Sequence, residues 1–178
     1  EMTQRPSCVA ERKEIVKSAH LCVTNETRRD ICGTVKWELR DPCSAILMQG
    51  EKRAEIPALS SVWLDNLIFP EADELKNYIS YEFWMDGQKV SWGTTLFCAP
   101  KHFAFEDPGL TWEVNGNEIR IHADAYAKCI EIRDMQQDLK LSDNYFDMNA
   151  GAVCVTVLEG QAAHLQVRSV YDIGKINE

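Results

Sequence analysis

The sequence predicts an all-β protein built from two antiparallel β-sandwiches in tandem. The first observation is that apolar side chains alternate with polar ones, as in residues 34–40, where Val35, Trp37 and Leu39 share one face. The second is that turn signals separate such runs at short, regular intervals. The third is that no stretch has the apolar spacing of a strong amphipathic helix. These observations favour sandwiches over an alternating β and α fold.

The amino-acid composition argues against two classes of binding partner, nucleic acid and membrane. The 178 residues are 45% hydrophobic, which is enough for one domain or two small ones. With 28 acidic and 19 basic residues the net charge is −9, so the chain as a whole repels phosphate backbones and nucleic acid is not an expected partner. A membrane helix needs about 20 consecutive apolar residues, and no such run occurs, so no membrane is expected either.

The seven cysteines predict a reducing compartment. Their number is odd and none lies in a C-x-x-C pair, which fits neither a disulfide framework nor a zinc ribbon. We expect most of them to be small buried hydrophobic residues. A cytoplasmic location is favoured because the first 20 residues contain charges where a signal peptide needs an apolar core. The chain begins without Met, so a longer protein with a signal further upstream stays compatible with this sequence.

Residues 17–99 are expected to form the first sandwich. Residues 1–16 precede it as a tether from an upstream domain, with an edge strand at Ile15–Val16 as the alternative. Asp86-Gly87 predicts a type I′ hairpin turn between the last two strands, because both of its central residues need positive φ. The expected strands are residues 21–23, 34–40, 45–48, 53–56, 62–68, 77–85 and 88–98.

Residues 100–109 are expected to be an ordered linker, since Pro100 and Pro108 restrict the backbone there. The second sandwich follows in residues 110–178. Its first hairpin turns at Asn115-Gly116-Asn117. Its apolar alternation runs through Leu110, Trp112 and Val114 and returns through Ile119, Ile121 and Ala123. Further strands are expected at residues 126–133, 153–158 and 164–168.

Two groups of residues resemble a known family. The later group is Pro100-Lys101, Phe105, Asp107-Pro108, Ala123, Ala125-Tyr126-Ala127-Lys128 and Leu141-Ser142-Asp143-Asn144-Tyr145-Phe146-Asp147. It is similar to the last immunoglobulin-like domain of β-mannosidases in glycoside hydrolase family 2. The earlier group, Val23 to Thr27, Gly33, Trp37-Glu38-Leu39, Gly50-Glu51 and Pro57 to Ser60, is similar to the sandwich that precedes it. Tyr145 stands where Phe is common, and Met148-Asn149-Ala150 replaces the usual Leu-Leu-Pro.

The resemblance implies two immunoglobulin-like domains at the carboxyl end of a larger enzyme. That enzyme would remove β-linked mannose from non-reducing ends with retention, using two glutamates on a barrel that lies outside this chain. The partner of the fragment would be this upstream catalytic barrel of the same polypeptide, which the fragment would pack on and stabilise. The corner at Asp143, Asn144, Tyr145, Phe146 and Asp147 would be structural. We expect Tyr145 and Phe146 in the core, with Asp143 and Asp147 accepting backbone N–H bonds.

No catalytic residue is predicted. Asn25-Glu26 resembles the Asn-Glu pair of the family's active site, but that pair ends a barrel strand, and 178 residues of β pattern cannot supply a barrel of about 250 residues. Asn25-Glu26-Thr27 also matches a glycosylation sequon, which has meaning only in a secretory pathway. The four histidines lack metal-ligand spacing, so neither a metal nor another cofactor is expected.

The aromatic residues leave a second hypothesis open. Trp37 and Trp112 share faces with aliphatic residues and are expected in the cores, whereas Trp92 could lie on either face of its hairpin. Trp84 lies on the other face of its strand, with Tyr78. That face would pack on a neighbouring domain, contact a sugar or face solvent. The alternative to a scaffold fragment is therefore a stand-alone carbohydrate-binding or adhesive β-sandwich protein, with an oligosaccharide as its ligand.

Overall fold

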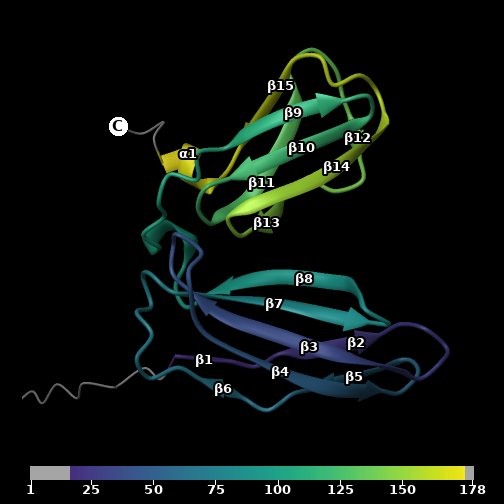
Figure 1. Cartoon of the computed structure of the whole chain (residues 1–178), viewed down its shortest axis with the longest axis vertical. Coiled ribbons are helices and arrows are strands. Elements are labelled where there is room, and N and C mark those ends of the chain that lie inside the picture. Colours follow the sequence, from purple (N-terminus) through teal and green to yellow (C-terminus); the bar gives the residue numbers. More distant parts are fainter. Residues whose placement is uncertain (1–16, 175–178) are drawn as a thin grey trace, which may run out of the picture.

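The computed structural model describes residues 17–174. They form two β domains that lie one above the other along the long axis of the molecule, joined by a connecting segment at one side (Figure 1). The strands pair in antiparallel sheets throughout both domains. The predicted fold class, two tandem antiparallel sandwiches, is confirmed. The tether expected at residues 1–16 and the alternative strand at Ile15–Val16 lie outside the described residues, as do residues 175–178.

The larger sheet of the first domain has the strand order β4-β3-β7-β8. Its strands are β3 (Ile31–Arg40), β4 (Ile46–Ile56), β7 (Tyr78–Met85) and β8 (Gln88–Leu96). The predicted turn joins β7 to β8, with φ of 50° at Asp86 and 76° at Gly87. The prediction of two strands at residues 45–48 and 53–56 is wrong, because β4 is continuous. Gly50 does not break the strand: it lies opposite Trp37, and a Cβ there would come within 2.5 Å of the Trp37 ring.

Within residues 17–174, the opposite layer of the first domain is two strands wide. β1 (Ser18–Ala19) pairs with β6 (Leu67–Ile68), and β2 (Cys22–Asn25) pairs with β5 (Ser60–Trp63). A backbone hydrogen bond from Leu64 N–H to the Leu21 carbonyl connects the two pairs. On the side away from β5 and β6, the β1 and β2 strands pair with no other strand of residues 17–174.

The core of the first domain is divided into two clusters. Val35 and Leu39 are buried as predicted, and Trp37 packs between the clusters. The first cluster contains Leu21, Val23, Val35, Ala54, Ile56 and Phe83. The second contains Ala19, Leu39, Phe69, Ala72 and Ile79. Each strand of the first domain therefore contributes only a few side chains to either cluster.

The second domain is a sandwich of four strands on three. One sheet has the order β12-β14-β10-β9 and the other β13-β11-β15. The strands are β9 (Thr111–Asn115), β10 (Glu118–Ala123), β11 (Ala127–Asp134), β12 (Lys140–Leu141), β13 (Phe146–Met148), β14 (Gly151–Glu159) and β15 (Leu165–Arg168). A short helix, α1 (Val170–Gly174), follows the last strand.

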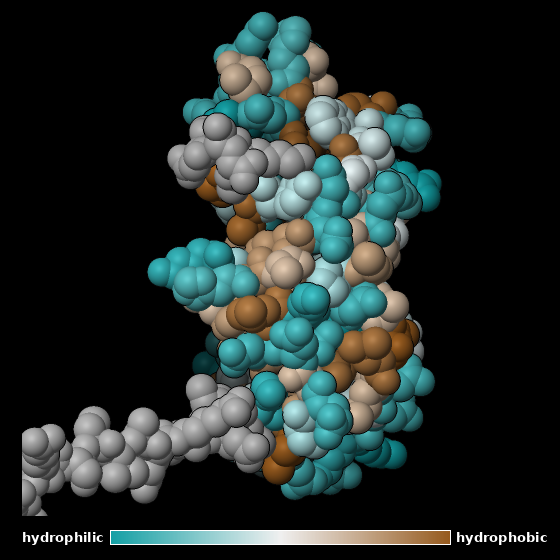
Figure 2. Space-filling model, turned by 90° about the vertical axis from the view of Figure 1, so that its left-hand side faces the viewer, coloured by the Kyte–Doolittle hydropathy of each residue, from teal (hydrophilic) through white to brown (hydrophobic). Residues whose placement is uncertain are grey.

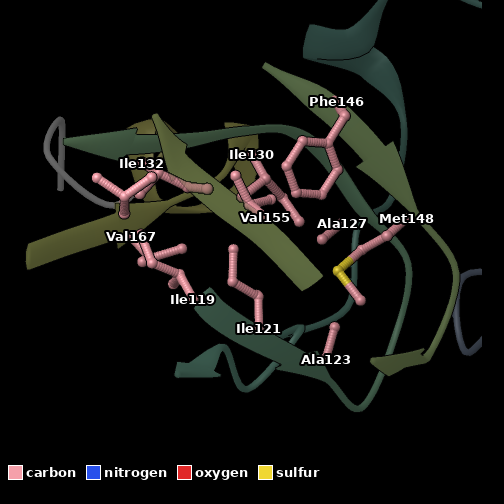
Figure 3. Close-up of a cluster of buried hydrophobic side chains, with 11 residues drawn as sticks. Ile119, Ile121, Ala123, Ala127, Ile130, Ile132, Phe146, Met148, Val155 and Val167 are labelled. Atoms are coloured by element: carbon pink, nitrogen blue, oxygen red, sulfur yellow. The ribbon is translucent and has the colours of Figure 1, made fainter. Parts of the chain in front are cut away.

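One continuous core fills the second domain (Figure 3). Ile119, Ile121 and Ala123 point inward from β10, which confirms the predicted alternation. Val155 lies beside Ile119 in the same sheet, and the opposite sheet contributes Ala127, Ile130, Ile132, Phe146, Met148 and Val167. Trp112 does not belong to this core as expected, since 40% of it is exposed. It faces the same way as Ile121, its cross-strand neighbour, but β9 is an edge strand and leaves one side of the ring open.

Candidate functional site at the junction of the two domains

The junction is built on an aromatic cluster. Tyr78, the first residue of β7, and Tyr126, which precedes β11, stack with ring centroids 3.8 Å apart and planes 16° from parallel. Phe103, which directly follows a short 3-10 helix (Pro100–His102), meets both rings edge-on at about 6 Å. The exposed fractions are 0% for Tyr78, 1% for Tyr126 and 6% for Phe103. The cluster thus joins the first domain, the connecting segment and the second domain in one buried contact.

Hydrogen bonds complete the tyrosine contact on one side. The Tyr78 hydroxyl donates to Asn149 Oδ1 at 2.8 Å, so its oxygen is free to accept from Ser44 Oγ at 3.0 Å. Ser44 Oγ in turn accepts from the Ala150 N–H at 2.9 Å. Asn149 Nδ2 donates to Ser80 Oγ at 3.0 Å. Each buried polar atom in this set has a partner in the other domain, which is the condition for burying such groups without a free-energy penalty.

A second polar set centres on Asp147. Its Oδ2 accepts from Thr94 Oγ1 of the first domain at 2.5 Å and from Lys128 Nζ at 2.8 Å. Its Oδ1 accepts from the Cys129 N–H at 2.8 Å. The exposed fractions of the Asp147 and Lys128 side chains are only 13% and 16%. Because the Thr94 hydroxyl donates to Asp147, its oxygen accepts from the Tyr126 hydroxyl. The Asp147 carboxylate therefore links the two domains through hydrogen bonds, beside the stacked tyrosine rings.

Burial keeps both tyrosines neutral. Desolvation raises the pKa of Tyr78 well above its ordinary value of 10. Desolvation first, and then the charge of Asp147, raises the pKa of Tyr126 in the same direction. A phenol with a raised pKa is a poor general base near neutral pH, but it is a stable hydrogen-bond donor. The arrangement holds two domains together, and these hydroxyls have no access to a substrate.

The corner at residues 143–147 lies beside this junction. The side chain of Asn144 bonds both backbone groups of Ile132, as the backbone of a neighbouring strand would. Its Oδ1 accepts from the Ile132 N–H and its Nδ2 donates to the Ile132 carbonyl, both at 2.9 Å. Asp143 accepts the N–H of Asn144, and Asp147 accepts that of Cys129, as expected of both carboxylates. The additional bonds of Asp147 across the domain junction were not predicted.

The expectation that Tyr145 lies in the core is wrong. Phe146 is buried at 8% exposure, as predicted, but Tyr145 is 64% exposed. Its φ of 60° turns the chain so that the ring points outward. The hydroxyl donates to Glu131 Oε1 at 3.1 Å, and this bond raises the pKa of Tyr145. Glu131 also bonds Arg168, which lowers the pKa of the carboxyl.

Trp84 and Tyr78 lie on the same face of β7 but have different surroundings. Tyr78 has no exposed ring face for a sugar, because the second domain covers that end of β7. Trp84, six residues further along, is half-buried. Its indole N–H donates to Glu82 Oε2 at 2.7 Å, and Lys36 Nζ lies 5.1 Å from its ring centroid. Trp92, the cross-strand neighbour of Glu82, lies on the same face and is 44% exposed.

Two hollows flank Trp92 at the edge of the junction. One, of about 170 Å³, lies between β8 and the second domain and is lined by Glu82 and Asn149 among others. The other, of about 470 Å³, is lined by Lys128 and Tyr145. Every buried side-chain nitrogen and oxygen in the described part of the chain already has a hydrogen-bond partner. The polar groups of the junction are thus used for structure, and a ligand in either hollow would have to share them.

The Asn25-Glu26 pair is structural. Asn25 is only 2% exposed, and its Nδ2 donates to the carbonyls of Arg29, Ile56 and Pro57. Its Oδ1 accepts from the N–H and the hydroxyl of Thr27. Glu26 is exposed in the turn after β2. The side-chain amide therefore ties three segments together, and the folded domain gives a glycosyltransferase no access to the sequon.

Two other expectations concern cysteines and metals. The expectation of buried thiols is wrong for the described cysteines: Cys22, Cys32, Cys43, Cys129 and Cys154 are exposed, and only Cys98 is partly buried. Burial raises the pKa of Cys98. Within residues 17–174, no group of His, Cys, Asp or Glu side chains is arranged to hold a metal ion. In the same residues, no helix is long and apolar enough to cross a membrane.

Apolar side chains also reach the surface in both domains. Figure 2 shows one side of the molecule, where hydrophobic patches interrupt a largely hydrophilic surface. Ile46, Leu47 and Met48 are three consecutive residues at the start of the edge strand β4, and about half of each is exposed. Exposed apolar side chains at an edge strand are typical of a surface that packs on another body.

Comparison with protein families matches both domains. Residues 17–102 match the model of the mannosidase Ig/CBM-like domain, and residues 105–173 match the model of a mannosidase Ig-fold domain. A comparison with curated proteins found no match. Together the two family matches cover nearly all of the described residues, domain by domain.

Two solved structures have the same fold. A β-D-mannosidase from Dictyoglomus thermophilum aligns with a TM-score of 0.69 at 14% identity, over 87% of this chain and 21% of that protein. An exo-chitosanase from Amycolatopsis orientalis, solved in complex with PNP-β-D-glucosamine, aligns with a TM-score of 0.57 at 11% identity, over 87% of this chain and 23% of that protein. The chain thus spans between a fifth and a quarter of the solved proteins it matches.

Proposed function

The chain belongs to the immunoglobulin-like domains of β-mannosidase-type enzymes of glycoside hydrolase family 2, and from this membership we propose that it is their non-catalytic scaffold. In this proposal, residues 17–174 pack on the catalytic barrel of the same polypeptide and stabilise it. The barrel would remove β-linked mannose, and the fragment itself would carry out no step of the reaction.

The observation that carries the proposal is the junction. Domains within one chain ordinarily move relative to each other unless their interface is large and apolar. Here two fully buried tyrosines stack between the domains, and the hydrogen bonds of Asn149 and Asp147 cross the same interface. A rigid pair of domains can support a neighbour at a fixed position, whereas two flexibly linked domains cannot.

The size of the matched enzymes and the surface of this chain support a large neighbour. The chain corresponds to 21% of the mannosidase and 23% of the exo-chitosanase, so most of each of those proteins lies outside the aligned region. The consecutive exposed residues Ile46, Leu47 and Met48 offer an apolar surface for such a neighbour. On packing, their burial would contribute roughly 25 cal/mol per Å² of apolar area.

The test has two parts. The isolated chain is expected to hydrolyse no aryl β-mannoside, and turnover that survives removal of contaminating enzymes would contradict the proposal. In the parent enzyme, a triple change of Ile46, Leu47 and Met48 to Ser is expected to lower the melting temperature of the barrel. The matched control is Leu59→Ser, which also changes an exposed leucine, 70% accessible, in the turn before β5. An unchanged barrel in the triple variant would exclude this surface.

The second candidate function is binding of an oligosaccharide, and one observation favours it. Trp84, Glu82 and Trp92 lie side by side on one face of the β7–β8 hairpin, and aromatic rings beside a carboxylate can bind the apolar face and the hydroxyls of a sugar. Titration with manno-oligosaccharides should then change tryptophan fluorescence saturably. Trp84→Ala should abolish this change, and Trp63→Ala, which removes an exposed tryptophan from the opposite layer, should not.

A reducing, cytoplasmic location stays a proposal. Exposed thiols such as Cys22, Cys43 and Cys154 are compatible with it, because thiols persist in reducing compartments and oxidise elsewhere. Thiol titration of the protein purified under anaerobic conditions, with and without prior reduction, would test it. Equal numbers of reactive thiols in the two samples are expected.

A further inference from the structure

The hollow of about 470 Å³ at the edge of the junction, called here the junction hollow, has walls from both domains. Strand β8 lies against β13 at this place (Figure 1). The first domain contributes residues 90–94 of β8, and the second contributes Asp143 and residues 145–147 of the corner. All of the lining residues belong to the described part of the chain. The volume falls within the range of small-molecule sites, about 300–1,000 Å³.

The wall from the first domain includes an indole ring. Trp92 lines the junction hollow and is 44% exposed. Lys89 Nζ lies 5.2 Å from the centroid of this ring, but Lys89 lines only the hollow of about 170 Å³ on the other side. The ring is therefore open toward the junction hollow. A partly exposed indole of this kind can stack on the apolar face of a ligand.

The wall from the second domain includes a phenol ring that is exposed but held in place. Tyr145 is 64% exposed. Its N–H donates to the Ile130 carbonyl at 2.8 Å, and its hydroxyl donates to Glu131 Oε1 at 3.1 Å. Arg168 in turn holds Glu131 through a second hydrogen bond. Because the ring is already ordered, it would lose less conformational entropy when a ligand binds than a mobile side chain would.

The backbone departs from regular strand geometry at the same place. Tyr145 and Cys129 both line the junction hollow, with φ of 60° and 51°. The register of β11 against β13 also shifts between Ala127 and Ile130. Bulky residues rarely adopt positive φ, and both such residues and β-bulges are frequent next to functional sites. The irregular geometry of the second domain beside the hollow is thus typical of a binding site.

The polar lining suits a neutral ligand with many hydroxyl groups. The charged residues of the lining are Lys128, Asp143 and Asp147, and Asp147 already neutralises Lys128 at a distance of 2.8 Å. The remaining charge is that of Asp143, whose Oδ1 accepts the next N–H and whose Oδ2 is left for a donor. Tyr81 and Ser91 add hydroxyl groups that lie outside the hydrogen bonds of the junction. An anion would be repelled here, whereas sugar hydroxyls can donate to the carboxylate.

We propose that the junction hollow binds a neutral oligosaccharide between the indole of Trp92 and the phenol of Tyr145. Both rings would stack on the apolar faces of sugar rings, and Asp143 would accept hydrogen bonds from their hydroxyls. The site goes beyond the scaffold function. It also differs from the second candidate function, because it needs Tyr145 of the second domain and does not need Trp84. A ligand that contacts both domains would stabilise their docking as well.

The test is a titration of the chain with a β-linked mannotriose. NMR of the indole N–H groups should show a saturable shift of the Trp92 signal and none for Trp63, which lies in the opposite layer of the first domain. In isothermal titration calorimetry, Tyr145→Ala and Trp92→Ala should each weaken binding at least about tenfold. Tyr145→Phe keeps the ring and should retain most of the affinity. The matched control Trp63→Ala also removes an exposed indole and should bind like the unchanged chain.

Three results would overturn the proposal. The first is the absence of a saturable shift up to about 10 mM mannotriose. The second is loss of binding in Trp84→Ala with full binding in Tyr145→Ala, which would place the sugar on the β7–β8 face. The third is equal binding of a trimer of galacturonic acid, since the charge of Asp143 should weaken it at least about tenfold. Melting temperatures of the variants show whether each is folded. None of these results bears on the scaffold function, which is tested by the stability of the barrel.

Discussion

The two domains enclose their hydrophobic cores to different degrees. In the second, sheets of four and three strands enclose a single cluster in which Ile119, Ile121 and Ile130 have no exposed surface. In the first, a four-stranded sheet faces a layer that is two strands wide in the described part of the chain, and a groove of about 710 Å³ reaches the core. Two domains of one fold class therefore differ in closure, and the number of strands in the thinner layer decides how well the core excludes water.

The largest effect is expected from a matched pair of phenylalanines. Phe146 in the second domain and Phe83 in the first are each 8% exposed; Phe83 lines the groove of about 710 Å³ in the first domain, and Phe146 borders the smaller hollow of about 470 Å³ beside the junction. Phe146→Ala should cost about 3–5 kcal/mol of unfolding free energy, since it leaves a cavity in the continuous second core. Phe83→Ala should cost less, because that site borders the larger opening. Denaturant unfolding of both variants measures the difference.

Equal costs of the two variants would contradict the difference in closure between the two cores. An unchanged melting temperature of Phe146→Ala would show that the corner is not part of the core.

A smaller loss of unfolding free energy is expected at Gly50, where the first domain is tightly packed. A Cβ at Gly50 would lie 2.5 Å from Cζ2 and 2.7 Å from Cε2 of Trp37, so Gly50→Ala must displace that ring from between the two core clusters. Overpacking of this kind costs about 1–3 kcal/mol. Gln49→Ala, at the exposed neighbouring position, should have little effect in the same unfolding experiment. A neutral Gly50→Ala would mean that the first domain is loose throughout.

The junction predicts an effect on cooperativity. Asp147→Asn removes the charge that Lys128 and Thr94 contact and should cost about 1.5–3 kcal/mol, the range for hydrogen bonds to charged groups. The unfolding transitions of the two domains should also separate, which calorimetry can detect. Asp143→Asn changes a carboxylate of the same corner that bonds only the next N–H, and should leave one transition. A single transition in both variants would show that Asp147 does not couple the domains.

The smallest effect is a dependence on pH. In the second domain, hydrogen bonds from Arg168 lower the pKa of Glu131, and backbone N–H bonds led by that of His164 lower the pKa of Asp134. A lowered folded pKa gives stability that is present above the ordinary values of 4.5 and 3.8 and is lost as the pH falls below them. In the first domain Lys52 lowers the pKa of Asp65, but that side chain is 86% exposed and solvent screens the pair.

Melting curves of the two domains between pH 6 and pH 3 test this expectation. The second domain should lose stability first as the pH falls, and Glu131→Gln should make its loss less steep. The reverse order would mean that the exposed carboxylates of the first domain dominate.

Local patterns predicted most of the strands, because each depends on neighbouring residues, although they divided the continuous strand β4 into two. The alternation of Ile119, Ile121 and Ala123 and the positive φ at Asp86-Gly87 follow from side-chain periodicity and turn geometry. The burial of Tyr78 could not be predicted in this way, since it depends on a second domain that meets one end of β7. The alternation of Trp112 was correct, but whether another strand lies beyond β9 is a property of the whole sheet.

The corner illustrates the limit most clearly. The family resemblance identified Asn144 to Asp147, and their side-chain types predicted the backbone bonds of Asp143 and Asp147. The outward turn of Tyr145 depends on one backbone dihedral angle, which a bulky residue rarely adopts. The contacts of Asp147 with Thr94 join residues 53 positions apart, and no local signal in the sequence encodes that distance.

The stacked tyrosines also make the junction an optical reporter. Tyr78 and Tyr126 are buried and have raised pKa values, so while the domains stay docked they should resist ionisation at pH values where exposed phenols already absorb as tyrosinate. Raising the pH through 10 favours separation of the domains, because the parted rings can then lose their protons. A delayed, cooperative step in an alkaline absorbance titration would therefore record undocking without any attached dye.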